Sequence, residues 1–233
     1  MVSPGSTRAV RGRGLRRSLL AGAAVLAAAG LVAGCSATPA SEETAESAST
    51  DGLPTVAVSS YPLAFIAETV GGDEVNVLDL STKGGHAHDM ELSPAQISSL
   101  SDADLALYLS QGFQPAVETA INQTGVPGMD GFDAVEDASI IKGDPHVWLD
   151  PLNLAAIGQE VAATLDQMNP ENAGHYDANA AKLTEEMEQI NEDYAQALAP
   201  CAGQSLLTSH EAFGYLAARF DLEQVGVMGI DPD

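Results

Sequence analysis

The chain has 233 residues, with 9 basic and 33 acidic side chains and a formal charge of −24 at pH 7. This balance excludes nucleic acid as a partner, because phosphate binding requires clustered lysine and arginine side chains. The acidic field favours cations near the surface, although adaptation of surface charge to the surrounding medium explains the same excess.

The first 35 residues are typical of an export signal. Five arginines within the first 17 residues precede an apolar stretch, 19–34, that ends at Cys35. The stretch is short for a membrane-spanning helix, and Val-Ala-Gly-Cys at its end resembles a bacterial lipobox, in which the cysteine receives a lipid. We expect residues 1–34 to be a lipoprotein signal peptide and Cys35 to be the lipidation site. An ordinary signal peptide, or a buried helix that happens to end in cysteine, is the alternative, and the export route stays open.

Residues 35–52 are expected to form a disordered tether, because Ser, Thr, Ala and Glu dominate there and bury too little apolar surface to order the chain. Loss of the five signal arginines leaves four of the nine basic residues against 33 acidic ones, so the mature charge is −29. Cys201 then has no cysteine to pair with inside this sequence.

Strands and helices alternate in the next segment, 53–168, which we predict to be an amino-terminal α/β lobe. Such alternation indicates parallel strand pairing. Ser93, Pro94 and Gln96 supply a capping box with proline at the first helical position, and Asp150-Pro151 caps a later helix. The strands are expected over 54–60, 74–80 and 104–109, with a short one at 134–136, and the helices over 62–70, 94–100, 114–121 and 151–168.

A long amphipathic helix is predicted over 169–200, begun by Asn169-Pro170-Glu171. Its apolar residues recur at steps of three or four, and about thirty residues would span roughly 45 Å. The apolar positions are Tyr176, Ala180, Leu183, Met187, Ile190, Tyr194 and Leu198. The helix is long enough to run along two lobes, and a partner-seeking coiled coil is the weaker reading.

The remaining residues, 201–233, are predicted to be part of a carboxy-terminal α/β lobe, with strands at 205–208 and 223–228 around a helix at 211–219. Two strands alone would leave unpaired edges. We therefore expect this lobe to be incomplete in the sequence.

Three histidines stand in separate motifs: His88 in GGHAHDMELSP, His146 in DPHVWLDP and His210 in SHEAFGYLAARF. Imidazole is a common ligand of transition metals. Each histidine lies just before a predicted helix, and in parallel α/β sheets the loops after the carboxyl ends of strands line the ligand crevice. We expect the three side chains to converge on one metal ion.

Together these motifs resemble the solute-binding lipoproteins of bacterial zinc and manganese ABC importers, and the likeness spans about residues 55–233. The resemblance implies two parallel-sheet α/β lobes joined by one long rigid helix, with the metal in the cleft between the lobes. It also implies that His88, His146 and His210 are three metal ligands, although Ala87 replaces the family's proline. The fourth family ligand, an acidic residue, has no counterpart before Asp233.

Zinc is the expected metal, because the third family ligand is usually histidine in zinc binders and glutamate in many manganese binders, and imidazole suits zinc better than manganese. Manganese, or iron, is the alternative. His86, two residues from His88, is a possible auxiliary ligand. We expect His175 to lie on the surface and Glu91 to hold the His88 loop in place. Asp89 and Asp144 are expected either to contact the ligand histidines or to lie in solvent, and Trp148 and Phe213 to pack around the site.

The predicted function is capture of Zn²⁺ by a receptor that delivers the ion to an ABC import permease. The receptor is expected to be a monomer held by the lipid on Cys35 to the extracytoplasmic face of the cell membrane. A zinc-dependent hydrolase is the rival of another class, since three histidines and a water are a hydrolytic set, but no HExxH helix is present. A surface adhesin is a third possibility, for which the chain offers no obvious adhesive surface.

Overall fold

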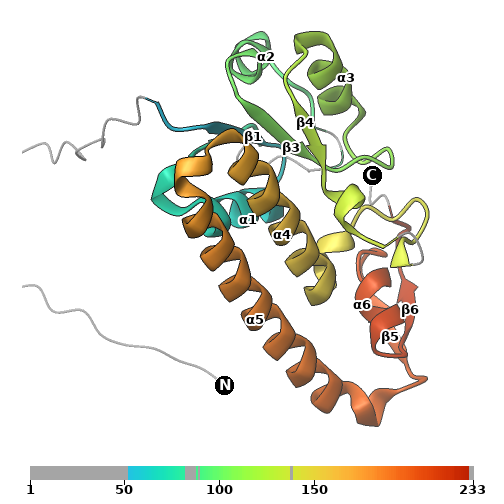
Figure 1. The fold of residues 1–233 in the computed structure, drawn as a ribbon. Coiled ribbons are helices and arrows are strands. Elements are labelled where there is room, and N and C mark those ends of the chain that lie inside the picture. Colours follow the sequence, from blue (N-terminus) through green and yellow to red (C-terminus); the bar gives the residue numbers. More distant parts are fainter. Residues whose placement is uncertain (1–51, 82–87, 89, 137–138, 231–233) are drawn as a thin grey trace, which may run out of the picture. The chain divides into compact units, whose positions relative to one another are not determined.

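Four parallel strands form the main sheet, in the order β2-β1-β3-β4 (Figure 1). The structure is a computed structural model that describes residues 52–81, 88, 90–136 and 139–230, all of which belong to the compact unit Glu46–Asp233. The strands are β1 (Thr55–Val58), β2 (Asn76–Asp79), β3 (Leu105–Tyr108) and β4 (Gly128–Asp130). The predicted parallel pairing is confirmed, with Val56 opposite Val77 on β2 and Leu105 on β3.

Alternate residues of the strands enter two separate cores, one on each face of the sheet. Val56 and Val58 lie in the larger core, with side chains from α1, α4 and α5. Ala57 lies in the smaller core, with side chains from α2 and α3. Both faces of the sheet are therefore covered, as the nearly continuous apolar runs of the strands require.

Three helices lie between the strands, and one of them, α2, begins at the predicted capping box. They are α1 (Tyr61–Gly71), α2 (Pro94–Ser101) and α3 (Pro115–Thr124). The capping box of α2 is present in full: the Ser93 hydroxyl accepts from the Gln96 backbone N–H at 3.3 Å, and the Gln96 side chain accepts from the Ser93 N–H at 2.9 Å. Each helix has proline in its first turn.

Two long helices, α4 (Pro151–Met168) and α5 (Ala173–Leu198), lie against each other and against α1. Asp150 caps α4, because its side chain accepts from the backbone N–H groups of Leu152 and Asn153. The two helices approach closely at Gly158, where an added Cβ would lie 2.7 Å from a methyl carbon of Leu183.

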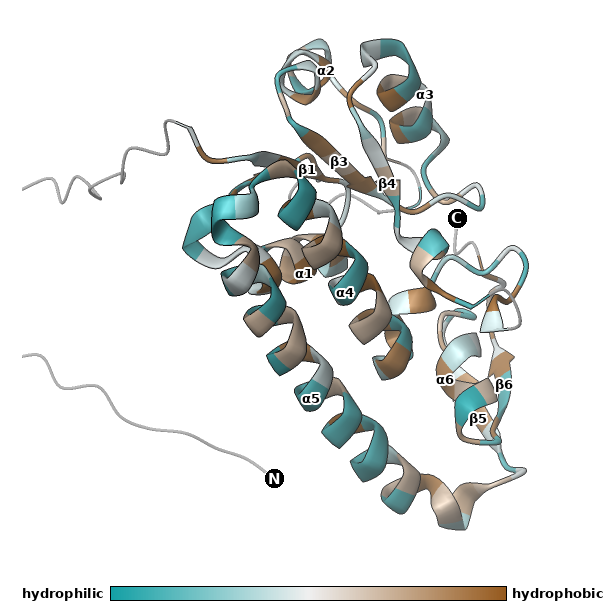
Figure 2. Ribbon diagram, in the orientation of Figure 1, coloured by the Kyte–Doolittle hydropathy of each residue, from teal (hydrophilic) through white to brown (hydrophobic). Residues whose placement is uncertain are grey.

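The long helix α5 lies within the predicted range 169–200, but it starts at Ala173 and not at Asn169, and two of its predicted apolar positions are exposed. It has 26 residues, roughly 39 Å, and it starts after a 3₁₀ turn at Pro170–Asn172 without a side-chain cap. Tyr176, Ala180, Leu183 and Met187 are buried, whereas Ile190 and Tyr194 are exposed. Figure 2 shows hydrophobic residues on β1, β3 and α1 and many hydrophilic residues along α5.

A second, two-stranded parallel sheet consists of β5 (Ser205–Thr208) and β6 (Glu223–Gly226), connected by α6 (Gly214–Arg219). The prediction that this helix begins at Glu211 is wrong: residues 209–211 form a bend, and the helix begins only at Gly214. The fold is thus the predicted α/β class, with two parallel sheets.

The prediction for residues 134–136 is also wrong. The fourth strand is β4, and a 3₁₀ helix at Gly131–Ala134 follows it, started by the Asp130 carboxylate, which accepts from the Phe132 N–H. Other 3₁₀ turns lie at Gly72–Glu74, Val147–Leu149 and Ala199–Cys201. No helix within the described ranges has the length and apolar content needed to cross a bilayer.

Candidate metal centre

All three predicted ligand histidines occupy loops that precede helices. His88 lies between β2 and α2, His146 lies before α4, and His210 lies between β5 and α6. In parallel α/β sheets, loops at the carboxyl ends of strands line the ligand crevice. The two sheets and α4 thus present the three imidazoles on loops of the predicted kind.

The imidazole rings of His88 and His210 both contact that of His146. The Nε2 atoms of His88 and His146 are 3.3 Å apart, and the centroids of these rings are 5.2 Å apart. The His210 ring contacts the same His146 ring, with a distance of 5.4 Å between the two ring centroids. His146 therefore contacts one histidine 58 positions before it and another 64 positions after it in the sequence.

The spacing of the first pair has the value that a shared zinc ion requires. With Zn–N bonds of ~2.0–2.1 Å and tetrahedral angles, two ligand nitrogens lie about 3.3–3.4 Å apart. His88 and His146 match this spacing. Over the described residues, however, no group of three or more His, Cys, Asp or Glu side chains is assembled as a metal-binding set. The arrangement is therefore a matched pair with a third imidazole beside it.

The carboxylate of Asp144 orients the imidazole of His146. Its Oδ1 accepts from the ring Nδ1 of His146 at 2.7 Å and from the His146 backbone N–H at 3.0 Å. A carboxylate accepts hydrogen bonds and does not donate them, so Nδ1 carries a proton, and in the neutral ring the lone pair is on Nε2, the atom that faces His88. Such a carboxylate–histidine pair fixes the tautomer and ring direction of a metal ligand.

Aromatic rings pack around the pair. Phe113 meets the His88 ring edge-on at 4.9 Å, and Trp148 contacts both His146, at 5.3 Å, and Phe113, at 5.7 Å. The predicted packing of Trp148 around the site is thus confirmed. The same prediction for Phe213 is wrong, because this side chain is 36% exposed.

The remaining predicted residues lie apart from this cluster or outside the described ranges. His175 is exposed, as predicted, and Glu91 is also exposed. Cys201 is a free, half-buried thiol. His86, Asp89 and Cys35 lie outside the described residues.

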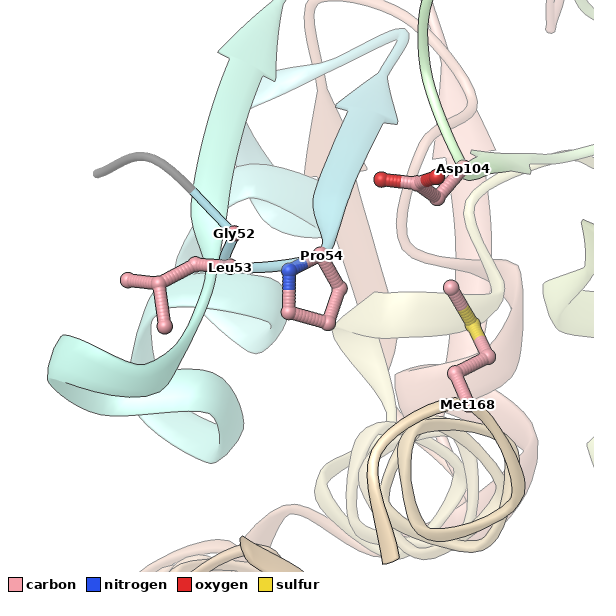
Figure 3. Close-up of a pocket in the computed structure, with 5 residues that line it drawn as sticks. All are labelled: Gly52, Leu53, Pro54, Asp104 and Met168. Atoms are coloured by element: carbon pink, nitrogen blue, oxygen red, sulfur yellow. The ribbon is translucent and has the colours of Figure 1, made fainter.

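A hollow of about 600 Å³ lies at the opposite ends of the strands (Figure 3). Its lining includes Pro54 and Asp104, which directly precede β1 and β3, and Met168 at the end of α4. The Asp104 carboxylate accepts from the Thr55 backbone N–H at 2.8 Å, so it has a structural role at the start of β1. This hollow is separate from the imidazole cluster.

Helix α6 contacts the His146 segment in ways that no sequence pattern predicts. The Tyr215 hydroxyl donates to the Asp144 carbonyl at 3.0 Å and accepts from the Ile141 N–H at 3.2 Å. The Arg219 guanidinium pairs with the Asp150 carboxylate. These contacts cross about 70 residues of sequence, and no local pattern signals them.

The α/β fold, with its long helix, is that of a family of solute-binding proteins. Residues 56–233 match the family described as "Zinc-uptake complex component A periplasmic". The chain belongs to this family.

Curated relatives carry names that agree with this assignment. The zinc-binding protein AdcA of Streptococcus pyogenes serotype M1 is 29% identical over 212 residues, which cover 78% of this chain and 41% of the relative. The high-affinity zinc uptake system protein ZnuA of Bacillus subtilis is 26% identical and is covered to 62%, with 76% of this chain aligned. The chain thus spans less than two thirds of the length of these relatives.

Solved structures give the same fold. The laminin-binding protein Lmb of Streptococcus agalactiae, described as an adhesin with metal-transporting activity, has a TM-score of 0.70 at 28% identity over 78% of this chain and 70% of its own. The Zn(II)-bound ZnuA-like domain of Streptococcus pneumoniae AdcA has a TM-score of 0.69 at 25% identity, covering 76% of this chain and 67% of that domain. Zinc is the metal named for the AdcA and ZnuA relatives, in agreement with the predicted choice over manganese.

Proposed function

We propose that this protein captures Zn²⁺ outside the cytoplasm through His88, His146 and His210 and delivers it to an ABC import permease. The observation that carries the proposal is the 3.3 Å separation of the His88 and His146 Nε2 atoms, which matches two ligands of one tetrahedral zinc ion. His210, whose ring contacts that of His146 at a centroid distance of 5.4 Å, would be the third ligand. His86 stays a possible auxiliary ligand.

Zinc is favoured over manganese by the donor set. Imidazole nitrogens suit zinc, whereas manganese prefers carboxylate, carbonyl and water oxygens. The relatives support this choice, since they are named for zinc binding or zinc uptake. These names describe binding and transport, and this weighs against the zinc hydrolase.

A lipid on Cys35 would hold the receptor at the outer face of the cell membrane. The lipobox-like Val-Ala-Gly-Cys supports this assignment, as does the name of a relative from Streptococcus pneumoniae R6, "zinc-binding lipoprotein AdcA". Residues 35–52 would serve as the tether. In a monomer, the first lobe would be 53–168, the linking helix 169–200, and residues 201–233 would belong to the second lobe.

Zinc titration against a chromophoric chelator tests the ligand assignment. We expect His146→Ala to weaken zinc binding at least about 100-fold, the upper end of what loss of even a supporting residue costs. His175→Ala is the matched control, because this exposed histidine lies on α5 away from the cluster, and it should bind as wild type does. Equal affinities for wild type and His146→Ala would contradict the proposal.

The anchor is tested separately by cell fractionation. We expect the wild-type chain in the membrane fraction and Cys35→Ala released from it or left as an unprocessed precursor. An unchanged, fully processed and membrane-bound Cys35→Ala protein would contradict lipidation at this residue.

A further inference from the structure

Gly214, the first residue of α6, lies directly on the carboxylate that orients His146. A Cβ added at this position would be 2.5 Å from Asp144 Oδ2 and 3.5 Å from a methyl carbon of Ile141. Real Cβ atoms essentially never approach another heavy atom closer than 3.0 Å. Any residue other than glycine must therefore move either Asp144 or α6.

Asp144 is not free to move. Its side chain is 2% exposed, and its other oxygen, Oδ1, holds both N–H groups of His146 at 2.7 and 3.0 Å. Rotation of the carboxylate away from α6 would break the bond that fixes the His146 ring. The contact at Gly214 is thus coupled to the direction of a proposed ligand.

α6 is held to the same segment by the next residue. Tyr215 is 2% exposed, and its hydroxyl bridges the Asp144 carbonyl and the Ile141 N–H. Four residues before Gly214, the chain passes through His210. A withdrawal of α6 from Asp144 would therefore also shift His210.

We propose that Gly214 and Tyr215 are positioning residues for zinc capture, which set the spacing between His210 and His146 by seating the first turn of α6 on Asp144. This inference rests on the proposed function. Glycine permits the close approach and the tyrosine hydroxyl secures it, so that two imidazoles from distant parts of the sequence keep one geometry before the ion arrives. Preorganisation of this kind lowers the cost of binding.

The first test is Gly214→Ala, with zinc affinity measured by chelator competition on the purified chain. We expect binding about 10- to 100-fold weaker than wild type, the usual effect of disturbing a residue that supports a metal ligand. Gly174→Ala is the control, since a Cβ there has nothing within 4 Å, and it should bind zinc as wild type does.

Tyr215→Phe, which removes one oxygen and is compatible with folding, should weaken binding about 3- to 10-fold, as loss of one hydrogen bond predicts. Tyr194→Phe serves as its exposed control.

A double-mutant cycle separates positioning from a general structural role. Asp144→Ala removes the atom that Cβ would meet, so adding Gly214→Ala to it should change zinc affinity by no more than about twofold, the scatter of independent effects. An equal loss from Gly214→Ala in both backgrounds would overturn the inference, as would wild-type affinity in both Gly214→Ala and Tyr215→Phe. If wild type itself shows no zinc binding that depends on His146, the proposed function fails and this inference fails with it. The wild-type and His146→Ala titrations distinguish the two failures.

Discussion

Asp150 and Arg219 form an ion pair in which one carboxylate serves two helices. Asp150 Oδ1 accepts from the backbone N–H groups at the start of α4, while Oδ2 accepts from the Arg219 guanidinium on α6. The Asp150 side chain is 5% exposed and that of Arg219 is 27% exposed. The pair therefore joins the helix that follows His146 to the helix that follows His210.

Removal of the arginine should destabilise the folded chain. Arg219→Met keeps the aliphatic stem but leaves a buried carboxylate without its cation, and we expect the free energy of unfolding to fall by about 1–3 kcal/mol, less than for a fully buried pair because Arg219 is partly solvated. Urea unfolding measures this value. Lys182→Met is the control: Lys182 pairs with Glu186 at 4.0 Å on the surface, and such a pair contributes about 0–1 kcal/mol. Equal losses in the two variants would contradict a special role for the Asp150 pair.

Local chemistry explains why much of the fold was predictable. Ser93 with Gln96, and Asp150 with Pro151, are capping signals within one turn, and the helices begin where these residues indicate. β4 has no such signal, because Gly128-Met129-Asp130 contains one apolar residue and becomes a strand only by pairing with β3.

The candidate site likewise combines features that the local sequence signals with features that depend on contacts between distant segments. The three histidine motifs are visible in the sequence, and the Asp144 contact with His146 spans only two residues. The close approach of Gly214 and the hydroxyl of Tyr215 depend on how α6 packs against residues 141–144. Side-chain packing between segments about 70 residues apart leaves no periodic pattern in the sequence. The roles of Gly214 and Tyr215 could therefore be recognised only in the structure.

Trp148 should report zinc binding directly. It is the only tryptophan of the chain, and its ring lies 5.3 Å from that of His146. A zinc ion on His146 changes the charge beside the indole, so we expect the emission of Trp148 to change and to saturate at one zinc ion per chain. The change should persist in His175→Ala and be lost in His146→Ala. An identical zinc response in both variants would place the ion elsewhere.

Tyr215 should make the fold sensitive to alkali. The pKa of Tyr215 is raised to about 12, chiefly by burial; the hydrogen bond from Ile141 acts to lower it and the Asp144 charge acts to raise it. The unfolded chain loses the tyrosine proton near pH 10, whereas the folded chain retains it, so the stabilisation is complete below pH 10 and is lost as the pH rises toward 12. The loss amounts to about 2–3 kcal/mol from this residue. Urea unfolding at pH 9 and pH 11.5 should show a smaller decrease for Tyr215→Phe than for wild type, and parallel decreases would exclude Tyr215 as the source.

His210→Glu should change the metal preference of the site. A carboxylate in place of the third imidazole replaces a nitrogen donor with an oxygen donor, and oxygen donors favour manganese relative to zinc. We expect the ratio of zinc affinity to manganese affinity to fall by at least about tenfold, corresponding to 1.4 kcal/mol of relative binding free energy. Competition titrations of both metals on wild type and His210→Glu measure the ratio, and thermal unfolding without metal checks that both proteins are folded. The His210 ring contacts that of His146, so an unchanged ratio in a folded variant would mean that His210 packs against the site without binding the ion.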